Sequence, residues 1–90
     1  PLRLQKYFVY ILQSESDSGY YIGFTSSLER RIWEHNSGKT RSLKHRRPLR
    51  LVYFEEYSSK SEAKAREQQI KSWKGGAAFR QLLDASSPRC

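Results

Sequence analysis

Two aromatic and β-branched runs, separated by a polar turn, constrain the fold of this chain more than any other feature. Residues 6–12 read KYFVYIL and residues 20–24 read YYIGF, compositions that are typical of β-strands. Between them, residues 14–19 read SESDSG, in which serine, aspartate and glycine favour a turn. The pattern therefore predicts a β-hairpin. Its strands carry Tyr10 and Tyr21 at positions where packing alone would be served by valine or isoleucine.

The residues that follow the hairpin predict a helix. Ser26 and Glu29 have the spacing of a capping box, in which each side chain satisfies a free backbone N–H of the first helical turn. Gly38 has the freedom to adopt the left-handed conformation that commonly ends a helix. We therefore expect a helix over about residues 27–37.

Three more elements are expected, a strand and two helices, at residues 49–57, about 59–74 and 77–84. The second helix begins with another capping-box pair, Ser59 and Glu62, and Gly75 and Gly76 should end it. The order β-β-α-β-α-α predicts an α+β fold in which a small three-stranded sheet is flanked by helices. The last residues, 86–90, are expected to fray.

The length and the cysteine content suggest a small intracellular domain. The chain of 90 residues is expected to form one domain over residues 1–90, with its core within about residues 6–84. The one cysteine, Cys90, cannot form an internal disulfide, which fits a reducing compartment. No apolar run approaches the roughly 20 residues of a membrane-spanning helix, and no signal peptide is visible. We therefore expect a cytoplasmic protein.

The positive charge of the chain is concentrated in one segment. The sequence has 17 lysines and arginines against 9 acidic residues, a net charge of +8. Residues 30–50 hold eight of these cations against Glu34 alone, a local net charge of +7. Such a cluster is typical of a surface that contacts phosphates, although a run of charges can also be a solvated face. We expect DNA contacts from the cations of the basic loop: Lys39, Arg41, Lys44, Arg46, Arg47 and Arg50.

Two polar residues border the apolar stripe of the first predicted helix. Leu28 and Ile32 form the stripe, and Arg31 and His35 lie four residues apart along one of its edges. Both side chains should therefore lie where the helix meets the sheet. An arginine there can rest its methylenes on the core and keep its charge in water, and a histidine can be a hydrogen-bonded structural residue. A functional role is the other interpretation.

Glu67 falls on the apolar face of the second predicted helix, between Ala63 and Ile70. A carboxylate that faces a core must be paired, hydrogen-bonded or bound to a metal, because an unpaired buried charge is costly. Two structural alternatives to metal binding remain open. One is an ion pair with a cation such as Arg31, and the other is a small rotation of the helix that exposes the carboxylate.

Taken in order, these residues resemble the motif of the GIY-YIG nuclease superfamily. The matching positions are Tyr10, the triplet Tyr21-Ile22-Gly23, Arg31 ten residues beyond Tyr21, His35 and Glu67. The first triplet is Phe8-Val9-Tyr10 here, so its glycine is absent. ARE..IKSWKG at residues 65–75 is similar to the family's metal-binding helix. The resemblance covers about residues 6–84 and is closest to small stand-alone bacterial members related to the nuclease domain of the excinuclease, the incision enzyme of excision repair.

The resemblance implies a metal-dependent DNA endonuclease that hydrolyses phosphodiester bonds, in DNA repair or recombination. It implies that Tyr21 is the general base or positions the water that acts as the base. It implies that Tyr10 forms a hydrogen bond to the water or in the surroundings of Tyr21. It implies that Arg31 binds the scissile phosphate and that His35 polarises the nucleophile or assists proton transfer. Glu67 would be the ligand of Mg²⁺ or Mn²⁺. A phenol titrates near pH 10, so Tyr21 would need nearby cations to act as a base at neutral pH. Arg31 and the metal ion would supply this positive charge.

Two departures from the family pattern leave other functions open. Phe24 stands where many relatives have a lysine or a small polar residue, and no asparagine follows the metal-binding helix at the position used by some members. One alternative is a nucleic-acid-binding module with little or no catalysis. Another is a non-enzymatic interaction module of a repair or ribosomal assembly. The expected partner is duplex or branched DNA. Nucleases of this family often carry a separate DNA-binding domain, which we do not expect here, so either the basic loop would serve alone or a partner protein would target the chain to DNA.

Overall fold

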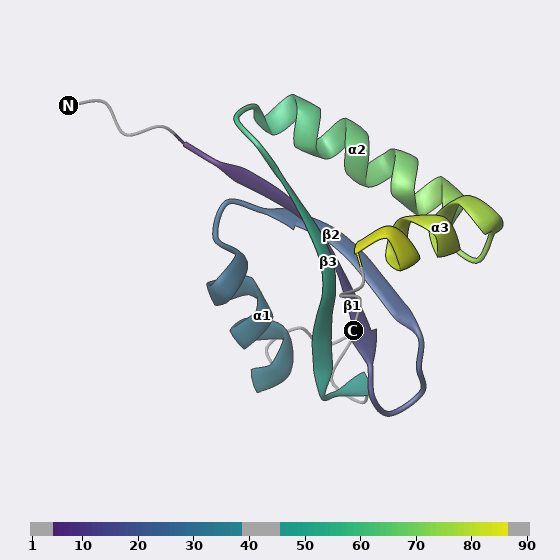
Figure 1. Cartoon of the computed structure of the whole chain (residues 1–90). Helices are drawn as coiled ribbons and strands as arrows, with labels where there is room; N and C mark the ends of the chain where they lie inside the picture. The colour runs from purple at the N-terminus through teal and green to yellow at the C-terminus, as the bar shows by residue number, and fades with distance from the viewer. Residues whose placement is uncertain (1–4, 39–45, 87–90) are drawn as a thin grey trace.

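The secondary structure follows the order that the sequence predicts. A computed structural model of the chain describes residues 5–38 and 46–86. Within them lie the strands and helices β1 Tyr7–Ser14, β2 Tyr20–Thr25, α1 Leu28–Ser37, β3 Leu49–Tyr57, α2 Lys60–Trp73 and α3 Ala77–Ser86 (Figure 1). Each predicted boundary lies within two residues of the observed one. The α+β fold with the order β-β-α-β-α-α is confirmed.

The three strands form one antiparallel sheet with β1 in the centre, in the order β2-β1-β3. α1 covers one face of this sheet, and α2 and α3 cover the other (Figure 1). Successive residues of a strand point to opposite faces. The neighbouring residues Val9 and Tyr10 of β1 therefore belong to different cores, and the sheet separates the two cores from each other.

The core between the sheet and the helices α2 and α3 is the larger of the two. Six buried side chains form it, from β1, β2, α2 and α3: Val9, Ile11, Ile22, Ala63, Ile70 and Phe79. Three buried side chains form the core on the α1 face: Tyr10, Leu12 and Leu49. Leu28 and Ile32 of α1 pack against this smaller core. The predicted apolar stripes of the first two helices are therefore confirmed.

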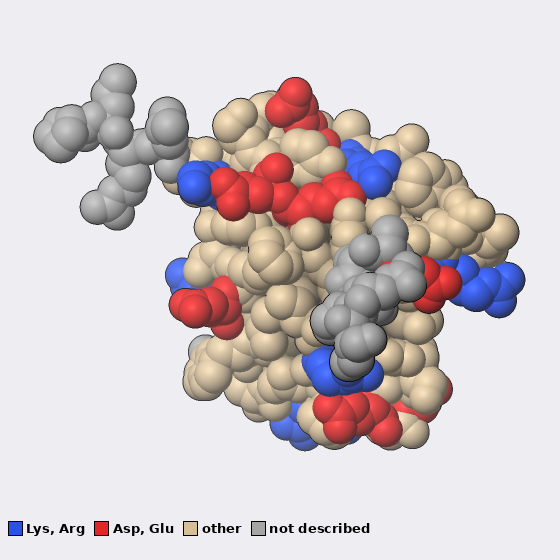
Figure 2. Space-filling view, viewed as in Figure 1, with Lys and Arg blue, Asp and Glu red and all other residues tan. Residues whose placement is uncertain are grey.

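The surface carries charges of both signs. In the view of Figure 2, several acidic side chains gather in the upper part, where β3 ends and α2 begins. Basic side chains are spread over the rest of this face. None of the helices within residues 5–38 and 46–86 is long and apolar enough to span a membrane.

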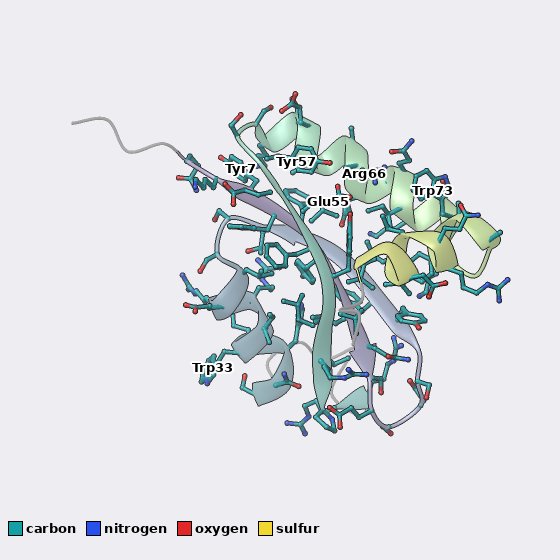
Figure 3. All side chains as sticks on the ribbon, in the orientation of Figure 1. Tyr7, Trp33, Glu55, Tyr57, Arg66 and Trp73 are labelled. Carbon is teal, nitrogen blue, oxygen red and sulfur yellow. The ribbon has the colours of Figure 1, made fainter. Side chains whose placement is uncertain are left out.

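An ion pair between β3 and α2 fixes how α2 is rotated on the sheet. Arg66 donates two hydrogen bonds to the carboxylate of Glu55, both of 2.9 Å, and lies over the ring of Trp73 (Figure 3). The hydroxyls of Tyr53 and Tyr57 donate to the same carboxylate. Burial alone would raise the pKa of Glu55, but these hydrogen bonds hold it below its usual value. With Arg66 turned toward β3, the next residue of α2 is turned toward the sheet.

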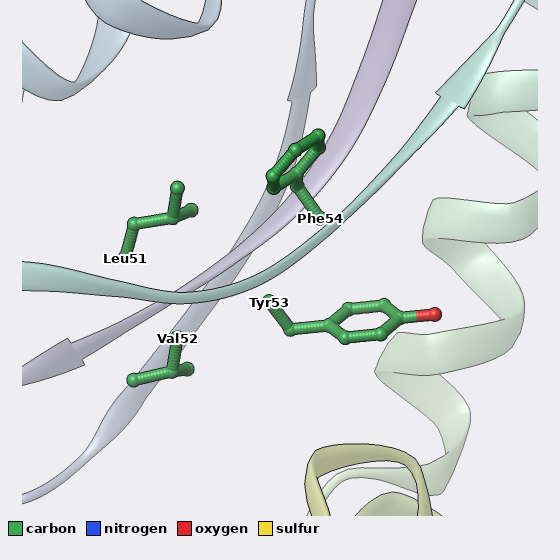
Figure 4. A pocket seen from close by; sticks show the side chains of 4 residues that line it. All are labelled: Leu51, Val52, Tyr53 and Phe54. Carbon is green, nitrogen blue, oxygen red and sulfur yellow. The ribbon is translucent and has the colours of Figure 1, made fainter. Parts of the chain in front are cut away.

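A β-bulge at Val52 interrupts the pairing of β1 with β3. Ile11 lies opposite Tyr53 and Leu12 opposite Leu51, so Val52 is the additional residue of β3. Figure 4 shows the result, because Val52 and Tyr53 point to one side of the strand and their two neighbours point to the other. The four residues 51–54 line a shallow pocket of about 250 Å³. The bulge thus directs two consecutive side chains of β3 to the larger core.

The predicted capping box at the start of the first helix is wrong. The N-cap is Ser27 rather than Ser26, and its side chain makes no capping hydrogen bond. Instead, the hydroxyl of Thr25 accepts the N–H of Ser27 at 3.1 Å. A local bond of this kind from a threonine side chain competes with helix capping. At the other end, Gly38 has a φ of 92° and ends α1 as predicted.

The second predicted capping residue is confirmed. Ser59 Oγ accepts the N–H of Glu62 at 3.4 Å, so the first turn of α2 is capped by its side chain. The helix ends at Trp73, and Gly75 then takes a φ of 86°, which few other residues adopt. The two glycines therefore act as the predicted end of α2 and allow the chain to turn into α3.

Candidate active site

The hairpin and α1 bring together three rings on the α1 face of the sheet. Tyr10 of β1 and Tyr21 of β2 have ring centroids 6.3 Å apart. The ring of His35 lies 5.1 Å from that of Tyr21 and 6.1 Å from that of Tyr10. The hydroxyl of Tyr10 is 3.1 Å from His35 Nε2, within hydrogen-bonding distance. Tyr10 is 1% exposed and His35 2%, whereas Tyr21 is only half-buried.

Gly23 makes room for the Tyr10 phenol. The two residues lie directly opposite each other in the antiparallel register of β1 and β2. A Cβ atom at Gly23 would lie 2.5 Å from the Tyr10 hydroxyl oxygen and 2.8 Å from its Cζ. The glycine of the second triplet is therefore required by the side chain across the sheet, and the two halves of the motif meet in space.

We predict that Gly23→Ala destabilises the protein by about 1–3 kcal/mol, the usual cost of overpacking a core, and displaces Tyr10 from His35. The free energy of unfolding in urea measures the effect. The same substitution in a Tyr10→Leu background is the control, because it removes the atoms that clash. The expected loss is smaller there, and equal losses in both backgrounds would contradict the steric explanation.

The two tyrosines differ in how deeply they are buried. Burial raises the pKa of Tyr10 well above its usual value, and the phenol of Tyr21 raises it further. The charge of Arg31 opposes this increase without cancelling it. Tyr10 is therefore a neutral O–H group at physiological pH and can donate or accept a hydrogen bond. Tyr21, which is less buried, is the phenol of this cluster that a ligand can reach.

His35 and Arg31 lie where α1 meets the sheet, as predicted, although His35 is more deeply buried than a border position implies. Burial lowers the pKa of His35, the nearby Arg31 lowers it further, and Glu34 opposes both. The imidazole is therefore neutral near pH 7 and has one donor and one acceptor nitrogen. Arg31 Nε lies 3.4 Å from Glu34 Oε1, and with 42% of its side chain exposed the guanidinium is open to solvent.

Glu67 is buried on α2 as predicted, with 8% of its surface exposed. Its ion-pair partner is Lys71, whose Nζ lies 3.3 Å from Glu67 Oε2. The expected alternative pairing with Arg31 is wrong, because Arg31 pairs with Glu34 on its own helix. The charge of Glu67 makes a small contribution to the raised pKa of Tyr10, so the two side chains interact electrostatically.

The donor chemistry of Glu67 fits Mg²⁺ or Mn²⁺. Among residues 5–38 and 46–86, no three His, Cys, Asp or Glu side chains lie close enough together to hold a metal ion. Glu67 would therefore not share the ion with two further side chains of these kinds from this part of the chain. Mg²⁺ is commonly bound in this way, by one or two carboxylates together with water and phosphate oxygens.

The predicted DNA-binding residues of the basic loop are only partly described. Lys39, Arg41 and Lys44 lie outside the described residues, as does Cys90. The three described arginines all contact other parts of the chain: Arg46 Nε lies 3.3 Å from Asp17 Oδ2, Arg47 donates to the carbonyl of Asn36, and Arg50 donates to the side chain of Gln13. Their role in DNA binding stays a prediction.

Two interactions at this site could not be read from the motif alone. The pair of Lys71 with Glu67 has the i, i+4 spacing that stabilises helices, so the spacing could have indicated it. The contact of Tyr10 with Gly23 depends on the hairpin register. A six-residue turn at residues 14–19 leaves several registers open, so no local signal predicts which residues lie opposite each other.

Comparison with known protein families identifies this arrangement. Residues 6–79 match the GIY-YIG catalytic domain. The chain belongs to the GIY-YIG family. The matched region contains every residue of the predicted motif, from Tyr10 to Glu67. The family resemblance is therefore confirmed, with a nuclease-like fold, while the closer relation to the excinuclease of excision repair stays a prediction.

The GIY-YIG chain also resembles a group of small proteins named UPF0213. A UPF0213 protein of Staphylococcus haemolyticus is 46% identical over 71 residues, which cover 78% of this chain and 85% of the relative. A UPF0213 protein of Haloquadratum walsbyi is 41% identical over 68 residues, covering 74% and 75% of the two chains. The solution NMR structure of the UPF0213 protein BH0048 from Bacillus halodurans is 34% identical, with a TM-score of 0.58 and coverage of 89% and 84%.

Proposed function

We propose that this GIY-YIG protein is a metal-dependent DNA endonuclease that hydrolyses phosphodiester bonds in DNA repair or recombination. The observation that carries the proposal is the cluster of Tyr10, Tyr21 and His35 beside the exposed guanidinium of Arg31. A merely structural cluster would not need a half-exposed arginine and a reachable phenol next to a buried, neutral imidazole. The family match adds to this argument.

Each side chain has a role that its environment supports. Tyr21 takes the proton of the attacking water or positions that water, because it is the accessible phenol of the cluster. Tyr10 stays protonated and holds His35 through the 3.1 Å contact. His35, neutral at physiological pH, polarises the nucleophile or passes on its proton. Arg31 binds the scissile phosphate and offsets the negative charge that develops in the transition state.

Glu67 would hold the divalent cation of the reaction. When bound, such a cation supplies Lewis-acid stabilisation of the leaving oxygen. The carboxylate is suited to this role because α2 holds it close to the sheet with little rotational freedom. Lys71 pairs with it and is 48% exposed, so this cation can move away into solvent when another ligand approaches.

A second function, nucleic-acid binding without cleavage, also has an observation in its favour. The charge of Glu67 is already compensated by Lys71, so the fold does not need a metal to satisfy this carboxylate. Phe24, which stands at a position where many relatives are polar, packs against the larger core instead of facing a ligand.

Incubation of the protein with labelled branched and linear DNA, with Mg²⁺ or with a chelator, distinguishes the two functions. We expect cleavage that requires the metal. Retained binding with no cleavage of any substrate at any metal concentration would support the binding module and contradict the nuclease.

A further inference from the structure

A second feature of the molecule lies away from the ring cluster, on the opposite face of the sheet. A groove runs between the end of the hairpin, at Gly19 and Tyr20, and the turn that joins α2 to α3. It consists of two adjoining hollows of about 430 and 290 Å³. Tyr20, Arg80 and Leu83 line both hollows, so the two are continuous. Their volumes are in the range of small-ligand sites.

The groove is strongly basic. Arg46, Lys74 and Arg80 line the larger hollow, and no acidic residue lines it. Arg50 and Asp84 line the smaller one together with Arg80. Among the described residues, four cations therefore face one carboxylate. Arg46 and Arg50 come from the end of the basic loop, and Lys74 and Arg80 come from the region of α2 and α3. Concave surfaces lined with one sign of charge focus the electrostatic field and concentrate ligands of the opposite sign.

The cations of the groove differ in how far other groups engage them. The ammonium of Lys74 donates to the carbonyl of Tyr20 at 2.7 Å, which holds it at the rim, and no described carboxylate forms an ion pair with it. Arg46 pairs with Asp17 at 3.3 Å, just outside the larger hollow. The guanidinium of Arg80 is exposed and makes no hydrogen bond or ion pair with the described parts of the chain. Arg80 is therefore the residue best placed to bind an anion.

The wall of the groove has a shape that suits a nucleotide. The ring of Tyr20 packs edge-on against Phe79, with centroids 5.1 Å apart, and is only half-buried. Gly75 and Gly76 form the opposite rim and carry no side chains that would narrow it. An aromatic wall beside fixed cations is the combination that binds nucleic acid through its backbone and its bases.

The groove is aligned with the proposed catalytic site along α2. Glu67 and Lys71 lie one turn apart on the same side of α2, and Lys74 follows directly after the last residue of this helix. At a rise of 1.5 Å per residue, the end of α2 lies about 10 Å from Glu67 along the helix axis, a separation that a few nucleotides can span. On the sheet, Tyr20 of the groove directly precedes Tyr21 of the ring cluster.

We propose that this groove binds the sugar-phosphate backbone of the cleaved strand, a few nucleotides from the scissile bond. The inference rests on the proposed nuclease function, which supplies the position of the scissile phosphate. It adds a binding site built from Arg80, Lys74 and Tyr20, on the opposite face of the sheet from the ring cluster. The strand would pass around the β2 edge of the sheet, from the ring cluster to the groove.

The first test measures DNA affinity at several salt concentrations, in chelator so that no cleavage occurs. For Arg80→Gln we expect the slope of log affinity against log salt to become shallower by about 0.9, the loss of one phosphate contact. Lys6→Gln is the control, because it also removes one exposed cation. Lys6 pairs with Glu56 at 3.0 Å and precedes β1, at the end of that strand away from the groove. Its slope should equal that of the parent. An Arg80→Gln slope equal to the parent's would overturn the proposal.

The second test locates the contact relative to the cut. Two duplexes are shortened to one nucleotide beyond the mapped cleavage site, one on each side. We expect one of the two shortened duplexes to lower kcat/KM of the parent protein to the value that Arg80→Gln has on the full-length duplex. The same shortened duplex should not lower kcat/KM of Arg80→Gln any further. Additive losses on both duplexes would overturn the proposed position. If no DNA is cleaved, the nuclease function fails, while the salt slopes still decide whether the groove binds DNA.

Discussion

Tyr21→Phe should lower the rate of DNA cleavage by about 10²–10⁴-fold, the usual effect of removing a general base, while DNA binding is retained. The substitution removes one oxygen and keeps the ring that packs against His35. Single-turnover cleavage with saturating protein measures the chemical step, and the salt-dependent affinity measures binding. A packing role instead predicts a normal rate and little change in stability, because the Tyr21 hydroxyl forms no hydrogen bond within the described parts of the chain.

Tyr7→Phe is the matched control for this experiment. Tyr7 lies at the start of β1 and packs against the other core, so the same chemical change there should leave the rate unchanged. Tyr10→Phe provides a further comparison, because the loss of its contact with His35 should cost stability as well as rate. Full cleavage by a folded Tyr21→Phe protein would exclude the proposed role of this phenol.

Glu67→Gln should abolish cleavage and leave the fold intact. The amide fills the volume of the carboxylate, but a neutral oxygen is a much poorer ligand for a hard divalent cation. The ion pair with Lys71 is also lost. Because Lys71 is 48% exposed, this loss should cost less than about 1 kcal/mol, the range for pairs that solvent screens. Relief of the desolvated charge should match or exceed this small cost, so the melting temperature in chelator should be unchanged or raised.

Glu67→Gln removes both the carboxylate and its ion pair with Lys71, and Lys71→Gln separates these two losses. It breaks the same ion pair but keeps the carboxylate, so cleavage should persist. Both variants need two measurements, the melting temperature in chelator and the cleavage rate with Mg²⁺. Strong destabilisation of Glu67→Gln would indicate that the carboxylate is mainly structural. A stable Glu67→Gln protein that still cuts DNA would remove the metal assignment altogether.

Much of the fold could be predicted because its signals are local. The hairpin strands, the glycine at the end of α1 and the burial of Glu67 follow from composition and from the helical period. The bulge at Val52 could not be predicted in this way, because the run of apolar and aromatic residues in β3 fits either face. The capping of α1 also differs from its prediction, because a neighbouring side chain competes with the expected cap. Thr25, one residue before the assumed cap, supplies a competing bond.

The residues of the candidate site could be chosen from the sequence, but their burial and their contacts with one another could not be predicted. Helical spacing placed Arg31 and His35 on one edge, yet the depth of His35 and its contact with Tyr10 depend on how α1 sits on the sheet. The difference between the two tyrosines likewise arises from packing, which buries Tyr10 and leaves Tyr21 accessible. The internal partners of the arginines at the end of the basic loop come from segments distant in the sequence.

The separation of the two cores by the sheet gives the halves of the site unequal local stability. α1 carries Arg31 and His35 and packs against a core of three buried side chains, to which it adds none of its own apolar ones. α2 carries Glu67 and belongs to a core of six, to which α2 and α3 contribute Ala63, Ile70 and Phe79. Units with few buried contacts open at lower free energy than the whole protein. Transient detachment of α1 would disassemble the ring cluster while the sheet and α2 remain folded. DNA held by Arg31 would oppose that detachment, so substrate would complete the site by keeping its weaker half closed.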